Sequence, residues 1–219
     1  GNAQQKAVNV RLNENTDLFQ IQTSSFDKIS ISAQLQQFSF QKAVIKEHDF
    51  FQLHIDGFSK SSVVGKPELP VLTRLIQIPE NAELVIENLQ FEEEIVDVSI
   101  YMNDFVLKPV QPSVAKSEDP DNYPFVQDEK TYNKNEFYTE ELVQVEVIGH
   151  LRNYRLAKIT IHPFQYNPTE NLLKVAKNIQ FDVQFKNADL QKTTQIQKKY
   201  NSLYFRGIGE RIVNNSLQK

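Results

Sequence analysis

Apolar and polar residues alternate with a period of two along most of this chain, and this pattern restricts the fold more than any other feature of the sequence. The alternation is clearest at Glu83 to Phe91, at Leu142 to His150 and at Tyr154 to His162. Such a pattern is typical of β-strands that bury one face. Turn residues, such as those at Asn167 to Asn171, separate the segments. Many short strands joined by turns predict an all-β fold, an antiparallel β-sandwich of the jelly-roll kind, rather than a parallel sheet.

The sequence also indicates further strands and some segments that are not strands. We expect the additional strands at residues 34–40, 44–55, 71–78, 95–101, 172–175 and 179–185. The acidic run at residues 92–94 is expected to be a solvated turn. Residues 187–199 are polar and predict a linker. Ser202 to Val213 predicts a short C-terminal helix, which Gly207 and Gly209 weaken.

The composition supports a sizeable β domain and argues against two kinds of partner. The 219 residues are 40% hydrophobic and include 15 phenylalanines, which is enough to bury a core. The net charge is only −4, with both signs interspersed, so no basic stripe favours nucleic acid as a partner. No apolar run approaches the roughly 18–20 residues that a membrane-spanning helix needs, and we expect no transmembrane segment.

The sequence carries no recognised motif for catalysis or cofactor binding. It has no cysteine, which excludes a thiol nucleophile, a thiolate zinc site and a disulfide framework. It has no GxGxxG, P-loop or GxSxG motif. None of the four histidines (His48, His54, His150 and His162) stands at metal-ligand spacing from another. We therefore expect no catalytic residue, no cofactor and no metal site.

A proline-rich loop, residues 109–126, separates two groups of predicted strands. Its main part, Gln111 to Val126, reads QPSVAKSEDPDNYPFV and carries one cation, Lys116, in front of a run of acids. Proline fixes its own φ angle and favours an extended conformation in the residue before it. We therefore expect a stiff, extended segment that presents Lys116 outward. Such a segment suits insertion into a cleft, because it loses little entropy on binding.

The acidic residues of this loop leave two alternatives open. Glu118, Asp119 and Asp121 are paired carboxylates of the kind that a glycosidase uses, although a proline-rich loop gives them little rigid support. Ser117 to Asp128 has the oxygen ligands of a calcium loop, but Pro120 and the missing glycine disagree with the EF-hand pattern.

The aromatic residues in and after the loop give a third alternative. An exposed aromatic row on one sheet face would suit a cell-surface β-sandwich module that binds carbohydrate or protein. The residues that would form this row are Tyr123, Phe125, Tyr132, Phe137 and Tyr138.

Four segments of the chain resemble a known family. They read GKPELPV from Gly65, QPSVAKSEDP and PFV within the proline-rich loop, ELVQVEVIGHLRNYRLAKITIHPFQYNP from Glu141, and LKVAKNIQFDVQF from Leu173. In this order and spacing the segments resemble the N-terminal prodomain of the gingipains, which are secreted cysteine endopeptidases of oral Bacteroidetes. The resemblance covers most of residues 65–190.

The resemblance implies an inhibitory role without catalysis. In this family the prodomain is a β-sandwich that covers the cleft of its partner, the cognate cysteine-peptidase catalytic domain, and a basic loop residue enters the S1 pocket. Arginine-specific members present an arginine there, so Lys116 implies the prodomain of a lysine-specific type. The residues expected to support the inhibitory loop are Ser113, Ser117, Glu118, Asp119 and Pro120.

The resemblance also implies an organisation and a location. Residues 1–219 would form a single prodomain, with a core sandwich at about residues 8–190, an inhibitory loop at 109–126 and a tail at 191–219 that leads toward the catalytic domain. Lys219 is the expected processing site. The protein is expected to be exported to the periplasm and then to the outer-membrane surface or the medium. The prodomain would keep the zymogen latent and would assist folding of the catalytic domain.

Overall fold

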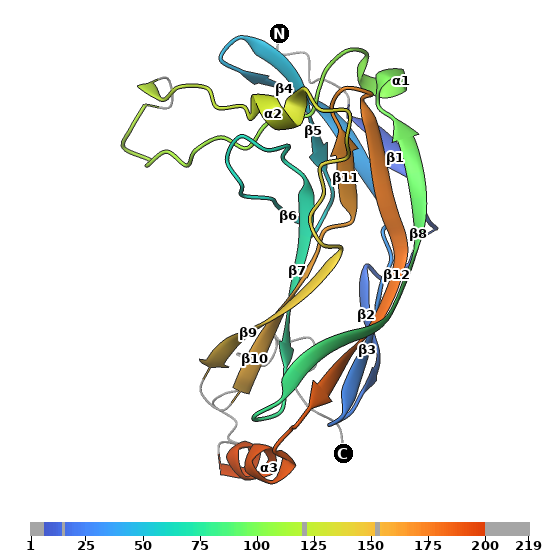
Figure 1. The fold of residues 1–219 in the computed structure, drawn as a ribbon, viewed down its shortest axis with the longest axis vertical. Coiled ribbons are helices and arrows are strands. Elements are labelled where there is room, and N and C mark those ends of the chain that lie inside the picture. The colour runs from blue at the N-terminus through green and yellow to red at the C-terminus, as the bar shows by residue number, and fades with distance from the viewer. Residues whose placement is uncertain (1–6, 15, 120–121, 152–153, 200–219) are drawn as a thin grey trace.

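Strands dominate the structure, a computed structural model that describes residues 7–14, 16–119, 122–151 and 154–199 (Figure 1). The strands are β1 (Val8–Arg11), β2 (Phe19–Ser24), β3 (Lys28–Ala33), β4 (Gln37–Ile45), β5 (His48–His54), β6 (Ser59–Lys60), β7 (Pro70–Gln77), β8 (Glu83–Asp97), β9 (Val143–Leu151), β10 (Tyr154–Ile161), β11 (Phe164–Asn167) and β12 (Leu172–Lys186). The helices are α1 (Ser99–Met102), α2 (Glu129–Tyr132) and α3 (Leu190–Lys199). No helix in these ranges is long and apolar enough to cross a membrane.

The strands form three sheets in which all named pairs are antiparallel. The strand orders are β1-β4-β5, β6-β7-β10-β9 and β11-β12-β3-β2, and β8 pairs with β12. In Figure 1 the sheet of β7, β10 and β9 lies beside the long strands β8 and β12, and side chains of both sheets contribute to one hydrophobic core. The predicted antiparallel all-β architecture is confirmed.

A cluster of aromatic rings fills the part of the core nearest the proline-rich loop. Phe38 packs edge-to-face against Phe40 and Phe164, with ring centroids 5.3 and 5.4 Å apart. Phe51 makes the same kind of contact with Phe40 at 5.5 Å and with Tyr166 at 5.8 Å. All five side chains are almost completely buried. Burial of such large rings, reinforced by edge-to-face contacts, gives the loop a rigid base.

The expected turn at residues 92–94 is wrong, because these residues lie inside β8. Strands β8 and β12 each run for 15 residues and pair along almost their whole length. The acids are held by cations on β12: Lys177 Nζ lies 2.7 Å from Glu94, and Lys174 Nζ lies 3.4 Å from Glu93. Opposite charges on neighbouring strands stabilise the pairing, so an acidic run can lie in a strand when its neighbour is basic.

Two asparagines explain why sequence periodicity divided β12 into residues 172–175 and 179–185. Asn178 on β12 and Asn88 on β8 have positive φ angles of 54° and 55°. The strand register shifts near both residues. Asparagine tolerates this left-handed conformation better than most residues. The resulting β-bulges interrupt the alternation without ending the strand.

The predicted strand at residues 44–55 is interrupted by a hairpin turn, so that it contains the end of β4, the turn and β5. Lys46 and Glu47 have positive φ angles of 46° and 68° and form the two-residue turn between β4 and β5. Ile45 and His48 pair across this turn. Neither turn residue is glycine or asparagine, so the usual hairpin signal is missing. Strands β1 to β3 were not predicted either.

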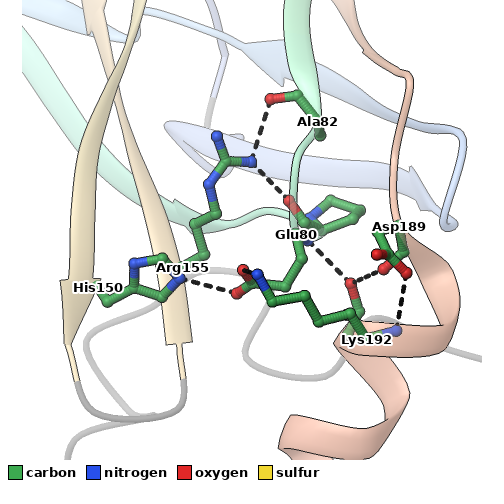
Figure 2. Close-up of polar contacts among 8 residues, drawn as sticks. Glu80, Ala82, His150, Arg155, Asp189 and Lys192 are labelled. Carbon is green, nitrogen blue, oxygen red and sulfur yellow. Dashed lines mark hydrogen bonds and ion pairs between the residues drawn. The ribbon is translucent and has the colours of Figure 1, made fainter.

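Residues 187–199 were predicted to be a linker, but they include the helix α3 (Figure 2). The carboxylate of Asp189 accepts a hydrogen bond from Lys192 N at 2.8 Å, which closes the first turn. The Thr193 hydroxyl donates to Asp189 O at 2.6 Å and accepts from Glu80 N at 2.8 Å. Asp189 N also donates to Glu80 O at 2.7 Å. The helix is therefore joined to the turn between β7 and β8.

The side chain of Glu80 adds contacts with a histidine and a lysine to this junction. The residue is only 5% exposed. Its carboxylate lies 2.8 Å from His150 Nε2 on β9 and 3.5 Å from Lys192 Nζ on α3. Arg155 on β10 donates to the carbonyl oxygens that flank Glu80, those of Pro79 and Ala82. The helix that was predicted at residues 202–213 lies outside the described residues.

Candidate functional site

The proline-rich loop leaves the core from a segment that two tyrosines hold. The hydroxyl of Tyr166 accepts a hydrogen bond from Leu107 N at 3.2 Å, and that of Tyr132 donates to Leu107 O at 2.7 Å. Leu107 is fully buried. The neighbouring Lys108 N donates to Phe51 O on β5 at 2.9 Å. The first arm of the loop, which leads from Leu107 to the tip at Lys116, therefore starts from a fixed position beside the aromatic cluster.

Gly65 joins the two ends of the loop. Its N–H donates to Val110 O at 2.8 Å, and its carbonyl accepts from Asp128 N at 2.9 Å. Its φ angle is +82°, and a Cβ at this position would lie 3.2 Å from Asp128 N and 3.4 Å from a methyl group of Val126. Glycine is required here both for the left-handed backbone and for the close approach of the returning arm, the segment that leads back from the tip to Asp128.

An ion pair next to Gly65 fastens the returning arm. Lys66 Nζ lies 2.5 Å from Asp128 and 2.6 Å from the hydroxyl of Thr131. The Asp128 carboxylate also accepts from Thr131 N at 3.1 Å and so caps the short helix α2. Its hydrogen bond with Lys66 and the cap together lower the pKa of Asp128 below its ordinary value. The carboxylate is therefore charged at neutral pH.

A side-chain amide holds the two arms of the loop together just beyond this base. Gln111 donates through Nε2 to Val126 O at 2.8 Å, and its Oε1 accepts from Val126 N at 3.1 Å. The side chain thus makes the pair of hydrogen bonds that a neighbouring β-strand would make. The arms are fixed at this level although their backbones are not paired.

The returning arm also packs against the β4–β5 hairpin. The ring of Phe125 stacks on Phe50, with centroids 5.7 Å apart and planes at 26°, and lies 5.7 Å from the ring of His48. The ammonium of Lys46, in the hairpin turn, donates to Tyr123 O. Residues 123–126 are therefore attached to β5 and its turn.

Lys116 lies at the tip of the loop, in a reverse turn. Glu118 N donates to Ala115 O at 2.9 Å, so Lys116 and Ser117 are the two central residues of the turn. The hydroxyl of Tyr123 donates to the Glu118 carboxylate, and this contact joins the returning arm to the turn. In Figure 1 the loop, in yellow-green, projects away from the body of the molecule. Lys116 is exposed.

The structure describes four of the five residues that were predicted to support the loop. Ser113, Ser117 and Asp119 are exposed, and Asp119 O accepts from Asn122 N at 3.1 Å. Glu118 bonds Tyr123 as described above. Pro120, Asp121 and Lys219 lie outside the described residues.

The structure does not support an aromatic binding row. Tyr132 is only 6% exposed and Phe125 stacks on Phe50. The hydroxyl of Tyr138 donates to Glu140 at 3.0 Å, and burial raises the pKa of this hydroxyl. The ring of Phe137 lies 4.6 Å from Lys174 Nζ. These rings pack within the domain and do not form one exposed face.

The acids of the loop are not gathered into a metal or glycosidase site in the part of the chain that the structure describes. Glu118 is bonded to Tyr123 near the tip, whereas Asp128 is paired with Lys66 at the base. No group of three or more potential metal ligands occurs among the described residues. Among the histidines, which were considered as metal ligands, Nε2 of His54 lies 3.1 Å from the carboxylate of Asp56. Desolvation lowers the pKa of His162.

Sequence reasoning did not identify the residues that hold the loop in place. Lys46 and Phe50 lie outside the segments that resemble the family, Gln111 begins one of them, and the roles of all three depend on partners that are distant in sequence. Gly65 gave the one usable signal, since an isolated glycine in a chain with only six glycines often marks a special backbone conformation.

Comparisons with known proteins agree with this fold. A family model described as Propeptide_C25 matches residues 6–208. A Lys-gingipain of Porphyromonas gingivalis is 31% identical over 212 residues, which cover 97% of this chain and 12% of the relative. A gingipain R1 of the same organism is 26% identical over 115 residues, which cover 52% of this chain and 11% of the relative. The chain thus spans only about an eighth of the length of these relatives.

Two solved structures are also similar. One concerns the zymogenic latency of gingipain K from Porphyromonas gingivalis, with a TM-score of 0.77, 33% identity and coverage of 84% of this chain and 100% of that chain. The other is the complex of the pro- and mature domains of RgpB from the same organism, with a TM-score of 0.72 and 18% identity, covering 92% and 99% of the two chains. At that identity the second likeness concerns the fold alone.

Proposed function

Because this chain belongs to the Propeptide_C25 family, we propose that it keeps a lysine-specific cysteine endopeptidase latent by covering the active-site cleft and placing Lys116 in the S1 pocket. The observation that carries the proposal is the position of Lys116. It is exposed at the tip of a loop that is held in three places. Gly65 bonds both ends of the loop, Gln111 bonds one arm to the other, and Phe125 stacks on Phe50 of β5.

The fastening of the loop supports tight binding. A free loop would lose conformational entropy when it entered a cleft, whereas this loop already has its arms fixed. The Gln111 clamp, the Phe125–Phe50 stack and the Lys66–Asp128 ion pair reduce that entropy loss. An ammonium that leaves water needs a charged partner in the pocket. A lysine-specific S1 pocket provides an acid that forms a charge-assisted hydrogen bond with it.

The remaining parts of the proposal concern the peptidase as a whole. This chain has no cysteine, so the catalytic thiol must belong to the partner. We assign the chain a non-catalytic role, with the catalytic domain of the same precursor as its partner. Assistance to folding of that domain, and export to the periplasm and cell surface, belong to the same proposal.

Titration of this domain into a lysine-specific gingipain catalytic domain tests the proposal. We expect stoichiometric loss of peptidase activity, and a loss of affinity of at least a hundredfold in Lys116→Ala. Lys130→Ala is the matched control, because Lys130 is another exposed lysine but lies on α2. Full inhibition by Lys116→Ala, or equal weakening by both variants, would contradict insertion of Lys116.

A further inference from the structure

A lysine held in the cleft of a lysine-specific peptidase is expected to be cleaved, and the tip of the loop offers an explanation of how it avoids this. The inference rests on the proposed function. The bond at risk, between Lys116 and Ser117, is the central peptide bond of the reverse turn that Glu118 N and Ala115 O close at 2.9 Å. Endopeptidases bind the residues around the bond that they cleave as an extended strand. A reverse turn does not have that shape.

A second contact stabilises the turn from outside. The hydroxyl of Tyr123 donates to the carboxylate of Glu118, the last residue of the turn. Tyr123 is itself held, because its carbonyl accepts from Lys46 and its neighbour Phe125 stacks on Phe50. To open the turn, the chain would have to break the Tyr123–Glu118 hydrogen bond or detach the returning arm from β5.

We propose that Tyr123, through its hydrogen bond to Glu118, keeps the Lys116–Ser117 peptide in the turn and so makes the loop an inhibitor rather than a substrate. Both are positioning residues, since they act on the geometry of the bond. Hydrolysis requires the peptidase thiolate to attack the carbonyl carbon of Lys116. The bond to Ser117 nitrogen then breaks as that nitrogen takes a proton from the peptidase's general acid and leaves as an amine. Water then hydrolyses the thioester, which leaves a carboxylate on Lys116 and returns the thiolate. An error of about 1 Å in the alignment of the reacting atoms slows such a step by about a hundredfold.

The fixed arms act after cleavage as well as before it. If the bond breaks, the new amine of Ser117 remains attached to the returning arm, close to the thioester at Lys116. Rejoining is then intramolecular and competes with attack by water. The same contacts that hold the turn therefore also slow net hydrolysis.

Three variants separate the hydrogen bond from the charge. Tyr123→Phe removes only the hydroxyl. Glu118→Gln removes the charge but keeps an oxygen that accepts from Tyr123. Tyr138→Phe is the matched control, because it removes a comparable tyrosine–glutamate hydrogen bond, 3.0 Å long, away from the tip. Each variant is incubated with a lysine-specific gingipain catalytic domain, and mass spectrometry measures cleavage between Lys116 and Ser117 together with recovery of activity.

We expect Tyr123→Phe to inhibit at first and then to be cleaved at least tenfold faster than the unmodified domain. Tyr138→Phe should be cleaved at the unmodified rate, and Glu118→Gln at a rate between those of the unmodified domain and Tyr123→Phe, because a neutral amide oxygen accepts a weaker hydrogen bond than a carboxylate. Equal cleavage of Tyr123→Phe and the unmodified domain would overturn the inference, and so would faster cleavage of Glu118→Gln alone. A complete lack of inhibition by the unmodified domain is a different result, since it would contradict the proposed function itself.

Discussion

At the scale of single residues, the site depends on a few side chains that link sequence-distant segments. Gly65 bonds both ends of the loop, and Gln111 bonds the two arms to each other. Lys66 neutralises Asp128 where the returning arm meets α2. Each of these contacts acts on the position of Lys116 without touching it. The position of Lys116 therefore depends on the residues at the base of its loop.

Gly65→Ala should lower the affinity of the domain for the peptidase, beyond the loss of thermal stability that any alanine at a positive φ angle causes. The added methyl group would lie 3.2 Å from Asp128 N, and alanine would be strained at a φ of +82° by about 1–2 kcal/mol. Gly57→Ala is the control, since it has a φ of +79° but its methyl group would meet only Leu18, at an ordinary 3.5 Å. Thermal unfolding should show similar losses of stability for both. Inhibition assays should show a loss of affinity for Gly65→Ala alone, and equal affinities would contradict a role for Gly65 in the loop.

At the residue level the sequence singles out Lys116, but it does not indicate Gly65, Gln111 or Lys46 as residues that hold the loop. A cation among prolines is visible in the sequence. The partners of Gln111 and Lys46 are 15 and 77 residues away, and no local pattern records such contacts. The residues predicted as supports were those next to Lys116 in sequence. Among these residues Glu118 bonds Tyr123, and further contacts of the loop come from β5, from the β4–β5 turn and from the segment around Gly65.

At the scale of elements, the pairing of β8 and β12 shows why local patterns misplaced a turn. The run at residues 92–94 is polar when considered alone, but the lysines of β12 make it compatible with a strand. Alternation predicted the strands that bury one face, as in β10, because the pattern there is local. It missed the short turn at residues 46–47 and the helix α3, whose stability comes from tertiary contacts with Glu80.

Asp182 on β12 should make the joined strands sensitive to acid. Its carboxylate accepts from Lys28 Nζ on β3 at 3.0 Å and from Asn88 Nδ2 on β8 at 2.8 Å. Hydrogen bonds from Ser30, Asn88 and Lys28 lower its pKa from 3.8 to about 2. A lowered pKa stabilises the fold above the unfolded value, and this stability is lost as the pH falls from about 4 toward 2.

Comparison of Asp182→Asn with the unmodified domain measures this effect. At pH 7 we expect the variant to be less stable by roughly 1–3 kcal/mol, because charged hydrogen bonds are lost. Chemical denaturation at several pH values should show the difference shrinking below about pH 4. A difference that stays the same down to pH 2 would show that the charge of Asp182 does not stabilise the sheet.

Glu80→Gln should loosen α3 while leaving the sheets intact. The change removes the charge that faces His150 and Lys192 but keeps the backbone hydrogen bonds of Glu80. Weakening of these two contacts together is expected to cost roughly 1.5 kcal/mol, or about tenfold in local opening. Compared with the unmodified domain, Glu80→Gln should therefore exchange its amide protons faster in residues 190–199 but not in β10. Glu93→Gln, which alters an exposed pair with Lys174, is the control, and equal exchange in both variants would contradict the role of Glu80.

At the scale of the whole molecule, the domain is a rigid base for one projecting loop. The sheets share a core, and its aromatic cluster lies where the loop starts. Phe51 contacts Tyr166 within this cluster, and Tyr166 holds Leu107 at the start of the loop. The antiparallel all-β class could be predicted from alternation alone. The position of the loop next to the aromatic cluster could not be predicted, since it depends on how the three sheets pack together.

A change of specificity tests most directly the claim that Lys116 occupies S1. The measurement is the inhibition constant of the unmodified domain and of Lys116→Arg against a lysine-specific and an arginine-specific gingipain catalytic domain. The account predicts that Lys116→Arg loses at least tenfold in affinity for the lysine-specific enzyme, because the two cations differ in length and shape. The ratio of its affinities should shift toward the arginine-specific enzyme. Unchanged affinities for both enzymes would contradict insertion of this side chain into the pocket.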